Sequence, residues 1–139
     1  MSDENRAVVR RFGEEYQSGH DVAVAEELLA DDFVDHCPFG PFSPDRNGVM
    51  GLFGMFFQAF PDLRAEIHEQ YTDGDKVITR KTFHGTHKGE FMGMPATDNA
   101  VTFDVFDVIA VRDGTMREHW NVVDGLALMI GVGAVPPMG

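Results

Sequence analysis

Cysteine is nearly absent from this chain of 139 residues, which contains only Cys37. A single thiol forms no internal disulfide and no metal site built from several cysteines. Long apolar runs are also missing, since none approaches the roughly 20 residues that span a bilayer. The segment 1–6 lacks the apolar core of a secretory signal. We therefore expect a cytoplasmic protein that does not bind membranes.

Basic residues are scarce as well: 11 Lys and Arg stand against 23 Asp and Glu, for a net charge of −12. An electrostatic field of that sign repels phosphate backbones and anionic lipid, so we expect no nucleic-acid partner. The apolar and charged fractions, 43% and 24%, are those of an ordinary globular protein. The length fits one domain over residues 1–139.

Phenylalanine and methionine are unusually frequent, with 12 and 8 residues respectively. In so small a protein these side chains either pack a bulky core or line a cavity for a flat apolar ligand. Composition alone leaves both interpretations open.

The order of sequence patterns predicts helices first and strands afterwards, which is typical of an α+β fold. A first helix is expected from Ser2 or Asp3 to Gly19, and a second over residues 21–30. A short extended segment follows at residues 31–36. Ser43 and Pro44 then predict the start of a third helix, which Pro61 ends.

The third helix carries the clearest apolar stripe, at i, i+3, i+4, i+7, i+8 and i+11: Val49, Leu52, Phe53, Phe56, Phe57 and Phe60. Such a stripe requires a broad apolar surface to pack on, and a sheet provides one. From residue 63 the period changes to two, which predicts strands over 63–71, 77–84, 101–111 and 115–123. Asp124 is expected to cap a short helix over 125–130. These patterns predict three helices packed on a curved antiparallel sheet.

The last predicted hairpin determines which polar side chains share a face. A two-residue turn at Asp113 and Gly114 would pair Asp107 with Trp120, whereas a three-residue loop would pair Asp107 with His119. We favour the three-residue loop, which also sets Val105 opposite Asn121. One face then carries Phe103, Val105, Asp107, Ile109, Arg117, His119, Asn121 and Val123.

A carboxylate, an imidazole and a carboxamide grouped among apolar residues are what a pocket needs to orient a ligand. Asp107, His119 and Asn121 are therefore the candidate catalytic residues. The alternative is that Asp107 and His119 form a cross-strand pair in which the two side chains only satisfy each other's hydrogen bonding.

Three segments resemble the SnoaL-like polyketide cyclase family: Asp32 to His36, Gly85 to Thr97, and Asp113 to Asp124. The resemblance follows the whole chain in order and spacing. It implies the cone-shaped fold of nuclear transport factor 2, in which a curved antiparallel sheet wraps around three N-terminal helices and encloses an apolar cavity. It also implies an aldol-type cyclase that closes a ring in an aromatic polyketide ester, without metal or organic cofactor.

One departure from the family concerns its acid/base residue. The family's catalytic Asp on the last strand aligns with Asn121, and a His on the preceding strand aligns with Asp107. A carboxamide donates a hydrogen bond to an oxyanion but does not exchange a proton at neutral pH. Asp107 would then act directly as the base, or would orient His119 as the base. In either case Asn121 would donate a hydrogen bond to the oxyanion.

Five further residues are predicted to contact a small hydrophobic substrate: His36, Phe53, Phe57, Phe91 and Val105. No helical pair of His or Glu at ligand spacing has a third ligand nearby, so we expect no metal. The cone hosts isomerases, hydrolases and non-enzymes, so a binding module, or an isomerase or hydrolase that uses Asp107 and His119, remains an alternative.

The outer face of the sheet is predicted to carry four apolar side chains: Phe106, Val108, Trp120 and Val122. A symmetric homodimer would cover this patch.

Overall fold

The computed structural model describes residues 2–137 and confirms the α+β fold. Three helical segments come first: α1 (Ser2–Arg11) with its π-helical continuation η1 (Phe12–Ser18), α2 (Val22–Leu28) and α3 (Arg46–Ala59). The first strand, β1 (Leu29–Asp35), lies between α2 and α3.

Four long strands and a last helix complete the fold. They are β2 (Arg64–Asp73), β3 (Lys76–Thr86), β4 (Ala100–Arg112), β5 (Thr115–Val123) and α4 (Gly125–Gly131), and α4 is capped by Asp124 as predicted. No helix within residues 2–137 is both long and apolar enough to cross a membrane.

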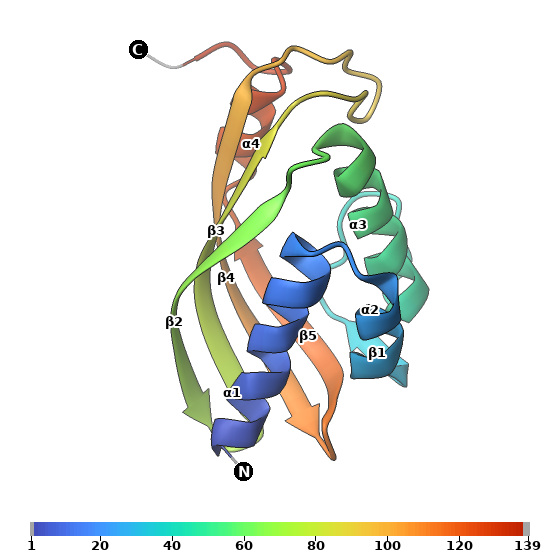
Figure 1. Cartoon of the computed structure of the whole chain (residues 1–139), viewed down its shortest axis with the longest axis vertical. Coiled ribbons are helices and arrows are strands. Elements are labelled where there is room, and N and C mark those ends of the chain that lie inside the picture. Colours follow the sequence, from blue (N-terminus) through green and yellow to red (C-terminus); the bar gives the residue numbers. More distant parts are fainter. Residues whose placement is uncertain (1, 138–139) are drawn as a thin grey trace.

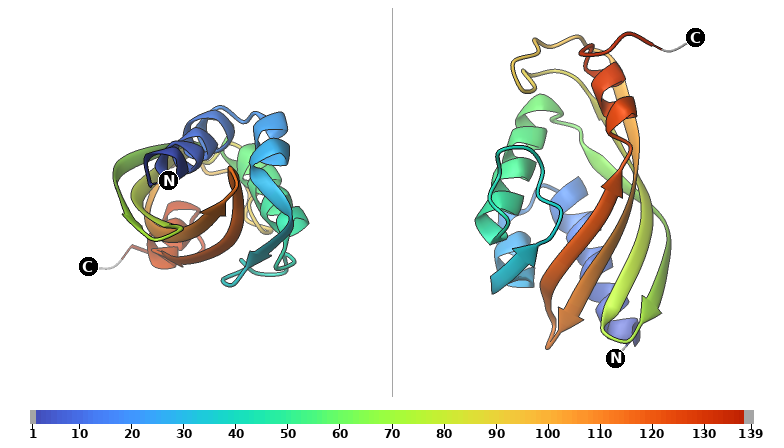
Figure 2. Two further views of the ribbon diagram at one scale, coloured as in Figure 1. Left: turned by 90° about the horizontal axis from the view of Figure 1, so that it is seen from below. Right: turned by 180° about the vertical axis from the view of Figure 1, so that it is seen from behind.

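The five strands form one curved sheet in the order β1-β5-β4-β3-β2. Neighbouring strands are antiparallel except β1 and β5, which are parallel, so the sheet is mixed rather than wholly antiparallel as predicted. The sheet curls around the interior, and α1, α2 and α3 close its open side (Figures 1 and 2). The interior between sheet and helices therefore has one strand wall and one helix wall.

Helix α3 supplies much of the helix wall. Val49, Phe53, Phe56 and Phe60 of its predicted stripe are all buried. The predicted start at Pro44 is wrong by two residues, because Asp45 is the N-cap and accepts from the backbone N–H of Gly48 at 3.0 Å. Pro44 instead uses its carbonyl to accept from the Asp35 amide, which ties the loop before α3 to β1.

The β4–β5 hairpin differs from the predicted register. Its turn has two residues, Asp113 and Gly114, whose positive φ values of 54° and 76° are those of a type I′ turn. A β-bulge at Arg117 then shifts the pairing, so that Asp107 faces Asn121 and Ile109 faces His119. The predicted pairing of Asp107 with His119 is therefore wrong by two residues. A shift of two keeps the side chains beyond the bulge on their predicted face, and Asp107, His119 and Asn121 all point inward. Before the bulge the shift is one residue, so Met116 lines the cavity where Arg117 was predicted to do so.

The close packing at the start of α3 leads to a prediction about stability. A Cβ added at Gly48 would lie 1.7 Å from the Ser43 carbonyl oxygen, whereas one added at Gly54 in the same helix meets nothing within 4 Å. We expect Gly48→Ala to lower the free energy of unfolding by about 1–3 kcal/mol. The matched Gly54→Ala should raise it by about 0.5–1 kcal/mol. Urea unfolding of both variants tests this, and equal effects of the two substitutions would contradict it.

Candidate active site

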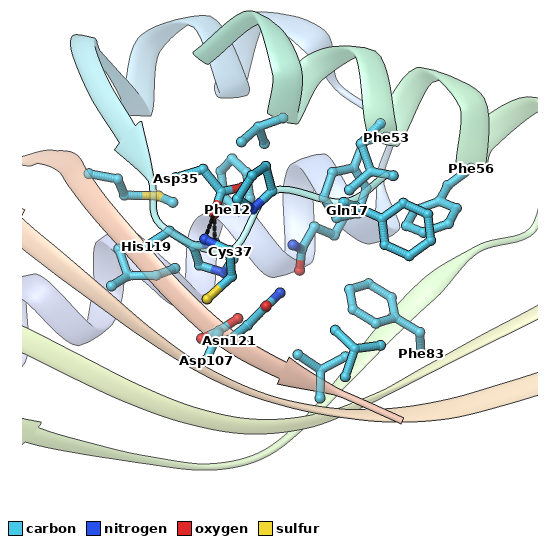
Figure 3. A pocket seen from close by; sticks show the side chains of 18 of the residues that line it. Phe12, Gln17, Asp35, Cys37, Phe53, Phe56, Phe83, Asp107, His119 and Asn121 are labelled. Atoms are coloured by element: carbon cyan, nitrogen blue, oxygen red, sulfur yellow. Dashed lines mark hydrogen bonds and ion pairs between the residues drawn. The ribbon is translucent and has the colours of Figure 1, made fainter. Parts of the chain in front are cut away.

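A cavity of about 330 Å³ lies between the strand wall and the helix wall. This volume is at the lower end of the range for small-molecule sites. Apolar side chains make up most of its lining, among them the predicted residues Phe53 and Val105 together with Phe12, Phe33, Phe83 and Phe103. Figure 3 shows Phe12, Phe53 and Phe83 around the cavity. The polar residues of the lining come from β1 and the loop after it, from η1, and from the three central strands.

The first polar group is an ion pair between neighbouring strands. Lys81 of β3 places its Nζ 2.6 Å from Oδ2 of Asp107 on β4, and both residues are at least 96% buried. The same Nζ donates to Oε1 of Gln17 in η1 at 3.1 Å. The other oxygen of Asp107, Oδ1, is buried and has no hydrogen-bond partner within residues 2–137. An acceptor left in this state in a cavity wall is available to a ligand.

The second polar group pairs β5 with β1. Nδ1 of His119 lies 3.1 Å from Oδ1 of Asp35, and the Cys37 amide donates to the same oxygen at 2.9 Å. Burial acts to raise the pKa of Asp35, but the hydrogen bonds from His119 and from the Cys37 amide hold that pKa below its usual value. The ionised carboxylate only accepts, so Nδ1 carries the hydrogen and Nε2 of a neutral His119 is the acceptor.

Asn121 lies on β5 directly opposite Asp107, one inward position beyond His119. Figure 3 shows the Asp107 and Asn121 side chains next to one another in the cavity, with His119 and Cys37 nearby. The three predicted catalytic residues therefore line one cavity, although Asp35, rather than Asp107, orients His119.

Three residues predicted to contact substrate are not part of this lining. His36 follows inward-facing Asp35, so alternation turns it outward, where its ring stacks on Trp120 with the centroids 4.5 Å apart. Phe57 points toward η1 and stacks on His20 at 3.9 Å. Phe91 is fully buried against Phe56 and Phe60, in the core beyond the cavity.

Sequence reasoning missed Lys81, Gln17 and Asp35 as site residues. Lys81 had a detectable signal, because it occupies the same alternate positions of β3 as buried Val77, Thr79 and Phe83. A lysine at an inward position of a strand needs a buried partner. Gln17 had no such signal, since its placement depends on the wider turn of η1. Such π-helical turns are frequent at functional sites.

The residues that the structure describes contain no group of three or more His, Cys, Asp or Glu side chains arranged to hold a metal ion. The charged and titratable side chains in the cavity instead form two separate pairs, Lys81 with Asp107 and His119 with Asp35. A neutral imidazole held by a carboxylate can move a proton, and the carboxamide beside it can donate to an oxyanion.

Comparison with known proteins agrees with this fold. Residues 7–130 match the family described as SnoaL-like polyketide cyclase. The aklanonic acid methyl ester cyclase DnrD of Streptomyces peucetius is 26% identical over 127 residues, which cover 86% of this chain and 83% of DnrD. DauD of a Streptomyces species, which bears the same cyclase name, is 27% identical over 86% of this chain and 75% of its own.

Two solved structures extend the comparison. IdmH of Streptomyces antibioticus, a candidate polyketide cyclase, superposes with a TM-score of 0.80 at 31% identity and covers 93% of this chain and 98% of IdmH. AclR of Streptomyces galilaeus, a candidate hydroxylase, superposes at 0.87 with 26% identity over 99% of this chain and 85% of AclR. Since the two structures share this fold but bear the names of different candidate activities, the chemistry has to be argued from the site.

Proposed function

Since the chain belongs to the SnoaL-like polyketide cyclase family, we propose that it is a cofactor-independent enzyme that closes a ring in a hydrophobic carbonyl compound by aldol condensation. The observation that carries the proposal is the His119–Asp35 pair in the cavity wall, beside Asn121. A proton acceptor and an oxyanion donor that share one apolar cavity are the two groups that enolate formation requires.

The proposed reaction begins with removal of a proton. Nε2 of His119 takes it from the carbon next to a substrate carbonyl, and Asp35 stabilises the resulting imidazolium through Nδ1. The negative charge moves onto the carbonyl oxygen, where the Asn121 carboxamide donates a hydrogen bond. Asp35 does not touch the substrate in this scheme and is a positioning residue.

Ring closure then joins the enolate carbon to a second carbonyl carbon of the same molecule. The electron pair of that carbonyl moves to its oxygen, which takes the proton back from His119 and becomes a hydroxyl. Substrate and product therefore have the same mass. The apolar walls fold the flexible chain so that its two ends meet, which removes much of the entropic cost of the step.

The direct test is an assay with aklanonic acid methyl ester, because DnrD and DauD bear the name of its cyclase. We expect conversion to a cyclised product of unchanged mass, measured by liquid chromatography and mass spectrometry, without added metal or cofactor. Binding of this ester without conversion would instead support a non-catalytic binding module, and addition of water would support a hydrolase.

We also propose that residues 1–139 act as one cytoplasmic domain that pairs into a homodimer. The argument for pairing is the outer sheet face, where Phe106 and Val122 are 52% and 76% exposed. Trp120 on the same face is partly covered by His36 and by the ammonium of Lys76, 5.9 Å from its ring centroid. Sedimentation velocity at micromolar concentration should report a dimer, and a monomer would contradict the pairing.

A further inference from the structure

The buried pair of Lys81 and Asp107 has two unused hydrogen-bonding groups. The Lys81 ammonium carries three donors, of which Asp107 and Gln17 take two. The carboxylate of Asp107 leaves Oδ1 without a partner within residues 2–137. A free donor and a free acceptor thus lie side by side in the cavity lining, on neighbouring strands.

The charges of this pair indicate what it can bind. One ammonium and one carboxylate at 2.6 Å sum to zero. An anionic ligand group would meet Asp107 and a cationic one would meet Lys81, so each would be repelled by one member of the pair. A hydroxyl is neutral and both donates and accepts, which matches the free donor and the free acceptor at once.

The surroundings indicate the kind of hydroxyl. The ring centroid of Phe83 lies 5.2 Å from Lys81 Nζ. Phe83 stacks on Phe103 at 5.3 Å and lies 6.1 Å from Phe53, and all three line the cavity. Flat apolar walls next to a hydroxyl-binding pair suit an aromatic ring that bears the hydroxyl.

We propose that Lys81 and Asp107 form a subsite for a phenolic hydroxyl, which donates to Oδ1 of Asp107 and accepts from Nζ of Lys81. The proposal rests on the proposed function only in taking this cavity as the substrate site. Substrates that carry a hydroxyl on a flat ring are then held by this pair, while the reacting carbonyl lies toward His119 and Asn121. A substrate without the hydroxyl leaves two buried polar groups unsatisfied, which costs affinity.

The test measures binding, so that it does not depend on turnover. We compare the dissociation constants of 2-naphthol and 2-methylnaphthalene, which differ in the hydroxyl but hardly in size, by titration calorimetry. The wild-type protein should bind 2-naphthol at least about tenfold more tightly. The double variant Lys81→Met/Asp107→Leu, which leaves no unpaired charge, should lose this preference.

His119→Gln serves as the control that separates the two proposals. It should keep the preference for 2-naphthol even though it is expected to lose ring closure. Failure of the cyclisation assay with the binding preference intact would overturn the proposed function alone. Equal affinity of the wild-type protein for the two probes, no binding of either, or an unchanged preference in the double variant would overturn the subsite. Equal affinity is also the result expected if the pair only holds a water molecule.

Discussion

Replacing His119 with glutamine is expected to lower kcat for ring closure by about 10²- to 10⁴-fold, the usual contribution of a positioned acid/base group. Glutamine keeps a polar side chain of similar length but accepts no proton at neutral pH. The change should appear in kcat rather than KM, because the apolar lining that holds the substrate is untouched. Steady-state kinetics with the cyclised ester as readout measure both constants.

Two variants sharpen this prediction. His36→Gln replaces a histidine whose ring lies outside the cavity on Trp120, so kcat should stay unchanged. Asp35→Asn keeps an acceptor for Nδ1 but removes the charge that stabilises the imidazolium, so kcat should fall by a smaller factor and KM should not change. If His119→Gln retained full activity while Asp107→Asn lost it, Asp107 Oδ1 would be the base.

Replacing Lys81 with methionine is expected to have the largest effect on stability, a loss of about 3–5 kcal/mol in the free energy of unfolding. Methionine has a similar length but no charge, so it leaves the carboxylate of Asp107 buried without a partner, and the side chain of Asp107 is only 3% exposed. The cost arises from this uncompensated charge more than from the lost attraction. Urea unfolding should give a lower midpoint with an unchanged slope.

The double variant Lys81→Met/Asp107→Leu provides the matched control. It removes both charges, so it should recover most of the stability lost by Lys81→Met. A second comparison uses Arg80, which precedes Lys81 in β3 and forms an ion pair with Glu69 of β2 at the surface. Arg80→Met should cost at most about 1 kcal/mol, because the side chains of Arg80 and Glu69 are 42% and 41% exposed to water. A loss below about 1 kcal/mol for Lys81→Met would mean that water reaches the pair in solution.

Local sequence signals predicted the fold well because they depend on periodicity. The apolar stripe of α3 and the alternation in β4 each identified a buried face without knowledge of the partner. The start of α3 was misplaced because a tertiary hydrogen bond engages the Pro44 carbonyl. The parallel pairing of β1 was missed for a similar reason, since it depends on where a loop returns the chain rather than on any local pattern.

The candidate site was predicted only in part. Asp107, His119 and Asn121 were placed on the correct face even though their register was wrong. The two-residue turn and the bulge at Arg117 each change the predicted pairing by one residue, and a total of two keeps these side chains on the same face. Their partners were not predicted, since Lys81 and Asp35 come from strands far along the chain. Such contacts are fixed by the closure of the whole sheet.

The direct pairing of Asp107 with Asn121 places two polar side chains of neighbouring strands at one point of the cavity wall. Side chains at opposed positions of adjacent strands have Cβ atoms only about 5 Å apart. Two point substitutions at this pair could therefore move a carboxylate from one strand to the other with the backbone unchanged. The walls of the cavity would stay the same, and only the strand that carries the acidic side chain would change.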